Sequence, residues 1–314
     1  MSPPTASIAG LYRGIGLLSL VTAVLLTACT QGNKEAMRLR ASCDAGDAGA
    51  CNKFAVKLQK GEYVLRDEPR AAGLFDRACA SGIGDSCASL GVMLEESQGI
   101  KRGGIKRDSV RAARLLQRGC EHGGMAGCAR LGILYRKGAG MPRDVVRAAS
   151  LFRQACDGGD LTGCAHLGTL YASGEGVTQD YSRAATLFTP ACEKKIAIGC
   201  AGLGRLHSAG TGVAQNDSIA ADLFTKSCGH GENAGCFGLA MAYELGKGIP
   251  QNYELAAEHY RESCEDRDGE ACARLADLYD KGAGVYRDSK RATKLRREAC
   301  EAGYTATCDK PKTA

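Results

Sequence analysis

The chain has 314 residues, enough for a substantial buried core, and its composition is biased, with 42 glycines, 7 prolines and no tryptophan. Such a bias is typical of a repeated sequence. The net charge of +6 is mild for this length and gives no indication of nucleic-acid binding.

The N-terminal segment has the features of an export signal. A hydrophobic stretch runs from Ile15 to Leu26, which is too short to span a bilayer. It ends at Cys29 in the letters LTAC, which resemble the lipobox of bacterial lipoproteins. The resemblance implies that residues 1–28 are removed and that Cys29 is acylated, and Thr30 after it favours the outer membrane. The alternatives are an ordinary cleaved signal and an uncleaved anchor helix.

The other sixteen cysteines form eight pairs with constant spacing. Each pair is separated by eight positions, and successive pairs lie 36 residues apart, except for one interval of 41. Random or reactive thiols would show neither constant spacing nor even parity, so the pattern predicts local disulfides. Disulfides form in oxidising compartments, which agrees with export. The predicted bridges are Cys43–Cys51, Cys79–Cys87, Cys120–Cys128, Cys156–Cys164, Cys192–Cys200, Cys228–Cys236, Cys264–Cys272 and Cys300–Cys308.

The fixed period predicts a solenoid of about seven helix pairs. Twelve residues before the first cysteine of each pair from Cys79 onward there is Asp or Asn, whose side chain caps the first turn of a helix. The helix that follows carries an apolar stripe and stops near the cysteine. The predicted caps are Asp67, Asp108, Asp144, Asp180, Asn216, Asn252 and Asp288.

A turn follows each first cysteine, and six of the turns have glycine three residues on, suited to the left-handed conformation that ends a helix. Lys195 and Arg267 break this rule, so their turns are expected to be strained or shaped differently. A second helix then carries the second cysteine near its first turn. It ends at a Gly-x-Gly segment, which we interpret as a helix stop and not as a phosphate-binding loop.

The aligned residues read AxLGxLYxxGxGVxxDxxRAAxLFxxAC and resemble the Sel1-like repeat, a relative of the tetratricopeptide repeat. The C-x7-C spacing is similar to that of the Helicobacter cysteine-rich protein (Hcp) family. The resemblance implies an all-α, right-handed α/α solenoid that often binds peptides or other proteins. The expected organisation is a lipoprotein signal at 1–28, a lipidated tether and first helix at 29–42, the solenoid at 43–308 and a tail at 309–314.

The last predicted helix differs from the others at one apolar position. Four residues before the cysteine the other helices carry an apolar or aromatic side chain, whereas the last carries Arg296. A terminal repeat has no neighbour to cover this position, so a polar cap is expected.

The sequence contains few of the motifs that catalysis would require. Some Hcp relatives are described as penicillin-binding or weakly β-lactamase-active, which makes such a hydrolase the alternative function. The chain has no Ser-x-x-Lys and no Gly-x-Ser-x-Gly motif, and its five histidines lie in five different repeats. No catalytic residue, metal or cofactor is therefore predicted. There is also no Cys-x-x-Cys, and the uniform spacing favours structural bridges over redox exchange.

Binding of a protein or peptide partner in the cell envelope is the favoured function. Positions 10, 13 and 17 after each first cysteine share one face of the second helix and vary, as expected for a groove. A stem peptide of peptidoglycan is a possible ligand, the basic segment 99–107 and the last helix could contact anionic lipids, and a secreted effector is a further alternative. The groove candidates are Arg130, Ile133, Lys137, His166, Thr169, Arg205, Met241, Arg274 and Asp277.

Overall fold

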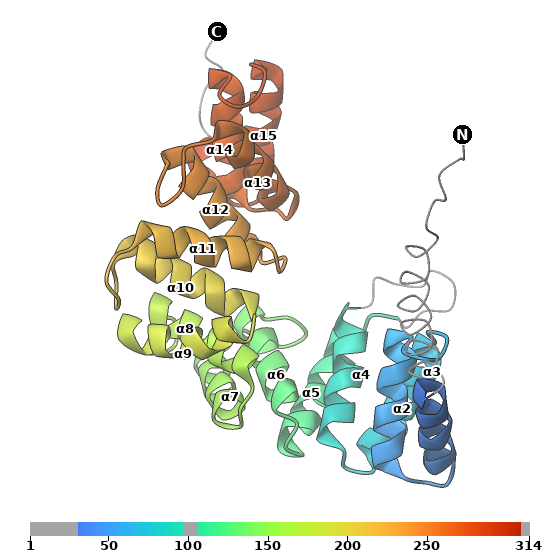
Figure 1. Cartoon of the computed structure of the whole chain (residues 1–314). Coiled ribbons are helices and arrows are strands. Elements are labelled where there is room, and N and C mark those ends of the chain that lie inside the picture. The colour runs from blue at the N-terminus through green and yellow to red at the C-terminus, as the bar shows by residue number, and fades with distance from the viewer. Residues whose placement is uncertain (1–30, 97–105, 309–314) are drawn as a thin grey trace, which may run out of the picture. The chain divides into compact units, whose positions relative to one another are not determined.

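The computed structural model describes residues 31–96 and 106–308 (Figure 1). The predicted signal, Cys29, most of the basic segment 99–107 and the tail 309–314 lie outside these ranges. Within them the chain forms helices and no strand, which confirms the all-α fold class. The chain divides into two compact units, residues 1–127 and 128–314, and each is described by itself.

The first unit begins, in its described part, with a helix over residues 31–44. Four helices follow, each about three and a half turns long. Their bounds are α2 Ala48–Lys60, α3 Glu68–Ala80, α4 Gly84–Glu96 and α5 Ser109–Glu121.

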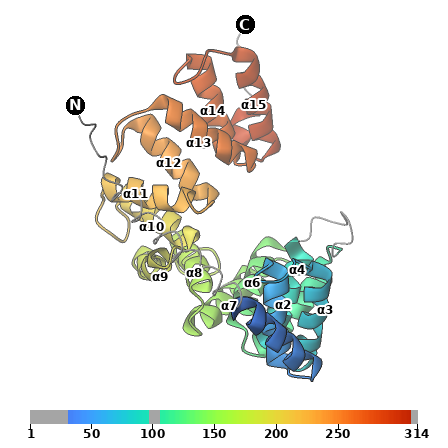
Figure 2. The ribbon, with the colours of Figure 1, turned by 45° about the vertical axis from the view of Figure 1, so that its right-hand side comes forward.

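The second unit contains most of the repeats. Helix α6 spans Met125–Lys137 and belongs to this unit from Cys128 onward. Both views of the ribbon show the later helices following one another as hairpins, each next to the one before (Figures 1 and 2). Their bounds are α7 Val145–Asp157, α8 Leu161–Ser173, α9 Tyr181–Glu193, α10 Ala197–Ala209, α11 Asp217–Cys228, α12 Asn233–Leu245, α13 Tyr253–Glu265, α14 Gly269–Lys281, α15 Ser289–Glu301 and the 3-10 helix η1 Thr305–Thr307.

All seven predicted N-caps are confirmed. In each, the Asp or Asn side chain accepts a hydrogen bond from a backbone N–H in the first turn of the following helix, as Asp180 Oδ1 does from Arg183 N at 2.9 Å. These bonds satisfy donors that a helix start otherwise leaves free. Local chemistry therefore sets where the first helix of each pair begins.

The turns between paired helices have one conformation, whichever residue occupies them. Gly159 and Gly231 have φ of 89° and 77°, and Lys195 and Arg267 have φ of 62° and 65°. The turns at Lys195 and Arg267 are thus strained versions of the common turn, because a left-handed backbone brings a Cβ atom close to the following carbonyl.

The Gly-x-Gly segments do more than stop helices. The first glycine of each is a left-handed C-cap, such as Gly246 after α12. The second packs against the start of its partner helix: a Cβ atom on Gly248 would lie 2.0 Å from the backbone oxygen of Asp217 in α11. The second glycine therefore allows the open ends of the hairpin to touch.

The core is built from aromatic rings of first helices inserted between glycines of second helices. Phe188 of α9 is fully buried. A Cβ atom on Gly168 of α8 would lie 2.9 Å from this ring, and one on Gly202 of α10 would lie 2.4 Å from it. Phe224 of α11 is held in the same way by Gly204 and Gly238. Because these helices have no side chain at the contact, consecutive second helices pack closely.

The disulfide framework is confirmed. All sixteen cysteines after Cys29 are disulfide-bonded, and each of the bridges named here joins residues eight positions apart across one helical hairpin. Each closes a loop of about nine residues, worth on the order of 2.5 kcal/mol in the chain-entropy model. The bridges are Cys43–Cys51, Cys79–Cys87, Cys156–Cys164, Cys192–Cys200, Cys228–Cys236, Cys264–Cys272 and Cys300–Cys308.

The polar cap expected at the last helix is ion-paired to the helix before it. The Arg296 guanidinium is only 23% exposed and forms ion pairs with Asp277 at 2.8 Å and Asp280 at 2.5 Å, both on α14. Asp280 occupies the repeat position of Glu244, and Arg296 that of Tyr260. A salt bridge thus replaces the aromatic contact of the inner repeats.

Candidate functional site

The second helices of adjacent repeats form a row in the second unit. Helix α10 contacts both α8 and α12, in addition to the first helices beside it. The side of these helices that faces away from the first helices is therefore a continuous surface, and most of the predicted groove residues lie on or beside it.

Two groove candidates are part of the core instead. Ile133 is buried among the apolar residues around Phe152. His166 is also buried, and its ring stacks on Phe152 with the ring centroids 5.0 Å apart. The position ten residues after the first cysteine thus faces the aromatic ring of the preceding first helix. In the next two repeats this position is Gly202 and Gly238, and the missing side chain leaves room for the ring. This differs from the surface position that helical periodicity alone indicates.

Burial gives His166 an unusually low pKa. Removal from water, followed by the positive charges of Arg136, Arg130 and Lys137, lowers its pKa from 6.5 to about 3. Its Nδ1 atom is buried without a hydrogen-bond partner. His166 is therefore neutral at physiological pH and acts as an aromatic packing residue.

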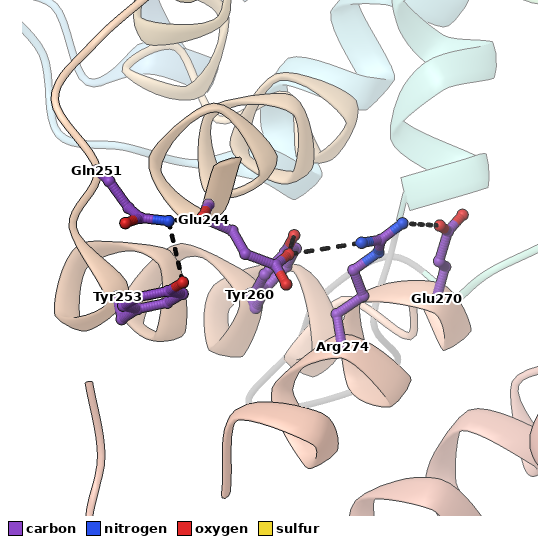
Figure 3. A network of polar contacts seen from close by, with 6 residues as sticks. All are labelled: Glu244, Gln251, Tyr253, Tyr260, Glu270 and Arg274. Carbon is purple, nitrogen blue, oxygen red and sulfur yellow. Dashed lines mark hydrogen bonds and ion pairs between the residues drawn. The ribbon is translucent and has the colours of Figure 1, made fainter. Parts of the chain in front are cut away.

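A further candidate, Arg274, belongs to a polar network between α12, α13 and α14 (Figure 3). The Arg274 guanidinium lies 3.5 Å from Glu244 Oε2 and 3.3 Å from Glu270 Oε1. Tyr260 is fully buried, and its hydroxyl donates a hydrogen bond of 2.5 Å to the same oxygen of Glu244. Asp277 is engaged by Arg296. These charges serve contacts inside the protein, which leaves them less able to bind a ligand.

Arg130, Lys137 and Thr169 lie at the other end of the row. Lys137 is exposed, and Arg130 is half-buried near His166. The Thr169 hydroxyl donates to the Ala165 carbonyl oxygen of its own helix at 3.1 Å. None of these three residues lines the pocket that Arg205 and Met241 share.

Arg205 and Met241 line a pocket of about 270 Å³ between α10 and α12, with α11 beneath. Its floor contains Phe224, whose ring lies against the backbone of Gly238. Small side chains on all three helices leave the space open. The lining residues are Arg205, Ser208, Ala209, Asp217, Ala220, Ala221, Phe224, Ala234, Phe237, Gly238, Met241, Ala242, Leu245 and Lys247.

One wall of this pocket is an apolar stripe on α12. Phe237, Met241 and Leu245 follow at intervals of four residues and therefore share a helix face. Leu245 is 48% exposed and extends the stripe to the surface. At its position the other repeats of this unit carry Lys137, Ser173, Ala209 and Lys281. The stripe is thus a particular feature of one repeat.

Three charged groups at this pocket have unused bonding capacity. Among the described residues, neither Arg205 nor Lys247 forms a hydrogen bond or a salt bridge, and Glu232 acts on Arg205 only through its charge at longer range. Asp217 Oδ1 is buried and accepts no hydrogen bond within the described part of the chain. An apolar pocket edged by unpaired cations and one free acceptor is chemically suited to a peptide that carries both an apolar and an acidic group.

Several pocket residues do not appear among the sequence candidates. Phe237 replaces an alanine found at its position in the other repeats of the unit, namely Ala129, Ala165, Ala201 and Ala273. Together with the apolar Leu245, this departure from the repeat is a signal that the sequence contains. Asp217 and Phe224 carry no such signal, because only packing brings them to the pocket.

A larger hollow of about 1050 Å³ lies in the first unit, beside the helix over residues 31–44. Met37 and Leu65 line it and are 63% and 92% exposed. Arg40, Arg66 and Arg70 stand at the same hollow. It is wide and combines apolar and basic side chains.

One group of side chains has metal-ligand atoms close together. Cys228 Sγ, Cys236 Sγ and a Glu262 oxygen lie within 4.8 Å of one another. The two sulfurs are joined in a disulfide, and a metal requires thiolates. The oxidised protein therefore offers no metal site at this group.

Helix pairs in series, one bridge across each hairpin and a row of second helices define an α/α solenoid. The family described as Sel1 repeat matches residues 49–83, 84–124, 126–160, 162–195, 197–232, 233–268 and 269–304. The chain belongs to this family. Solenoids of the Sel1 and tetratricopeptide type generally bind protein partners.

Two solved structures show the same fold, and a third is similar to part of the chain. A protective antigen present in uropathogenic Escherichia coli strains, displaying an SLR fold, is 26% identical with a TM-score of 0.58, over 87% of this chain and 57% of that one. A Sel1 repeat protein from Oxalobacter formigenes is 23% identical with a TM-score of 0.55, over 87% and 78%. The Helicobacter pylori cysteine rich protein B is 27% identical with a TM-score of 0.34, over 41% and 93%.

The chain therefore spans little more than half the length of the first of these proteins. A search of curated proteins found no match. Among the described helices, none is both long and apolar enough to cross a membrane. The many disulfides indicate an oxidising, extracytoplasmic location.

Proposed function

We propose that the chain is a lipid-anchored, non-enzymatic scaffold of the cell envelope that binds a protein or peptide partner in the pocket between α10 and α12. One observation carries the proposal. The apolar stripe of Phe237, Met241 and Leu245 stands beside Arg205, which forms no hydrogen bond or salt bridge among the described residues. A solenoid that needed α12 only for stability would gain nothing from an exposed Leu245.

The pocket chemistry describes the ligand. A volume of about 270 Å³ accommodates one or two apolar side chains of an extended segment. Arg205 and Lys247 attract a carboxylate next to that anchor, either an acidic side chain or the end of a chain. The buried Asp217 Oδ1 accepts an N–H from the ligand, which removes the cost of an unsatisfied acceptor.

The proposed anchor is the acylated Cys29 after removal of residues 1–28. It is supported by the LTAC letters and by the oxidised cysteines of the repeats. Met37 and Leu65, exposed beside three arginines, follow within 40 residues of Cys29, and such a mixture suits the surface of an anionic membrane. A mass spectrum of the native N-terminal peptide tests the anchor: a diacylated or triacylated Cys29 supports it, and an unmodified N-terminus contradicts it.

The binding site is tested by selecting peptides from a random displayed library against the oxidised mature protein. We expect the selected peptides to share a large apolar residue next to Asp, Glu or a free C-terminus. Fluorescence polarisation with one such labelled peptide then compares variants. Arg205→Glu and Met241→Asp are each expected to weaken binding about tenfold or more, as for central residues of an interface.

Lys226→Glu is the matched control. Lys226 is an exposed cation on α11 outside the pocket, so this variant makes the same charge change as Arg205→Glu without touching the lining. It is expected to bind as the wild type does. Selected peptides with no shared pattern, or equal weakening by Lys226→Glu and Arg205→Glu, would refute the assigned pocket.

A further inference from the structure

One repeat carries a histidine where every other repeat carries leucine. Five residues before the first cysteine of each of the seven pairs from Cys79 onward, the chain has a leucine six times, and in the remaining repeat it has His259, on α13. The leucines are Leu74, Leu115, Leu151, Leu187, Leu223 and Leu295. A polar, ionisable ring in this apolar position calls for an explanation other than packing.

The His259 ring lies beside the disulfide of the preceding repeat. Its Nδ1 atom is 3.9 Å from Cys228 Sγ and 3.0 Å from Glu262 Oε2. Glu262 Oε2 is in turn 4.0 Å from the same sulfur. The other face of the imidazole stacks on Tyr243, with the rings 9° from parallel and their centroids 6.0 Å apart. The imidazole is thus held against the sulfur by one carboxylate and one aromatic ring.

The two sulfurs of this bridge differ in environment. Cys236 is buried at 8% exposure, whereas Cys228 is half-buried and stands at the end of α11. Cys228 is therefore the sulfur that an incoming group reaches, and it is also the one beside His259. Cys192 has a similar half-buried place in its repeat, but Leu223 occupies the position equivalent to His259.

We propose that Cys228–Cys236 is a redox-active disulfide that exchanges with an external dithiol, and that His259 promotes this exchange. The remaining bridges are structural. A protonated imidazole beside Cys228 Sγ attracts the incoming thiolate, which is the reacting form of a thiol, and later stabilises Cys228 as it leaves as a thiolate. A leucine offers neither effect. Glu262 Oε2 accepts a hydrogen bond from His259 Nδ1–H and so positions the ring beside the sulfur.

The exchange proceeds in two balanced steps. A thiolate of the dithiol attacks Cys228 Sγ, a mixed disulfide forms, and the Cys228–Cys236 bond breaks with its electron pair going to Cys236, which takes a proton from water. The second thiolate of the reagent then attacks the reagent sulfur in the mixed disulfide. Cys228 leaves as a thiolate beside the imidazolium of His259. Two electrons have passed from the dithiol, now a disulfide, to the bridge.

The experiment measures how fast each bridge opens in the oxidised, full mature chain. Dithiothreitol is added in limiting amount, samples are quenched with acid, new thiols are alkylated, and peptide mass spectrometry assigns them to bridges. We expect Cys228–Cys236 to open about tenfold faster than Cys192–Cys200 and Cys264–Cys272, which follow the same geometry but face leucine positions.

Two variants then distinguish the effect of the His259 imidazole from the effect of the surrounding residues. His259→Leu introduces the residue of the other six repeats, and His259→Gln keeps a polar group that cannot become a cation. Both are expected to slow the opening of Cys228–Cys236 to the rate of the two reference bridges and to leave those rates unchanged. Equal opening of all three bridges in the wild type, or fast opening of Cys228–Cys236 in either folded variant, would overturn the proposal.

Discussion

The hydroxyl of Tyr260 donates a hydrogen bond of 2.5 Å to Glu244 Oε2, and this bond joins the centre of α13 to the end of α12 (Figure 3). Tyr260 is fully buried, and burial together with the Glu244 carboxylate raises the pKa of its phenol above the ordinary value. The equivalent side chains of other repeats are apolar or, at Arg296, ion-paired. The Tyr260 hydroxyl and the Glu244 carboxylate thus satisfy each other's hydrogen bonding away from water.

Tyr260→Phe is expected to lower the free energy of unfolding by about 1–2 kcal/mol, because Glu244 loses its main buried partner. No large cavity forms, since phenylalanine occupies this position in four other repeats. Urea titration followed by circular dichroism measures the change. Tyr253→Phe is the control: its hydroxyl, bonded to Gln251 in Figure 3, belongs to a residue that is 38% exposed, and its loss should have little effect. Equal effects of the two variants would contradict this assignment.

His166 predicts a dependence of stability on acid. Its pKa is about 3 in the folded protein and 6.5 in the unfolded chain, so only the unfolded chain binds a proton between these values. His166 therefore leaves the free energy of unfolding unchanged above pH 6.5. Below that pH it lowers the free energy of unfolding as the pH decreases towards 3, by up to about 1.4 kcal/mol per pH unit. The free energy of unfolding at pH 7 and pH 4.5 should therefore differ less in His166→Gln than in the wild type. The exposed His122, changed in the same way, should leave the difference as it is.

The close approach at Gly248 predicts a steric effect separable from backbone strain. Gly248 and Gly231 have nearly equal φ, 75° and 77°, so alanine suffers the same left-handed strain at both. A Cβ atom at Gly231 meets nothing within 4 Å, whereas at Gly248 it meets the Asp217 backbone. Gly248→Ala should therefore cost about 1–3 kcal/mol more than Gly231→Ala in thermal or urea unfolding. Similar losses in both variants would show that the hairpin end is not tightly packed.

The turn at Arg267 predicts a stabilising substitution. A left-handed conformation costs a residue with a Cβ atom about 1–2 kcal/mol, and the greater freedom of glycine in the unfolded chain offsets about half of the gain. Arg267→Gly and Lys195→Gly should each raise the free energy of unfolding by about 0.5–1 kcal/mol. Lys194→Gly, one residue before the strained position and with φ of −88°, should give no gain. A gain at Lys194 as large as at Lys195 would argue against relief of strain.

Much of the fold could be predicted because its signals are local and repeated. The Asp and Asn caps act within one turn of helix, and each cysteine pair spans one hairpin, so both follow from spacing alone. The groove was predicted less well. Position 10 of the second helix has the periodicity of a surface residue, yet His166 there covers Phe152 of the first helix of the same hairpin.

The sequence by itself determined the number of repeats, the start of each first helix and the pairing of the cysteines, since each depends on residues less than one repeat apart. Only the tertiary structure decided what the departures from the repeat do: that Phe237 and Leu245 face Arg205, that Arg296 meets two aspartates, and that His259 lies beside Cys228. These contacts join different helices, and their chemistry depends on angles and distances set by packing, which periodicity does not contain.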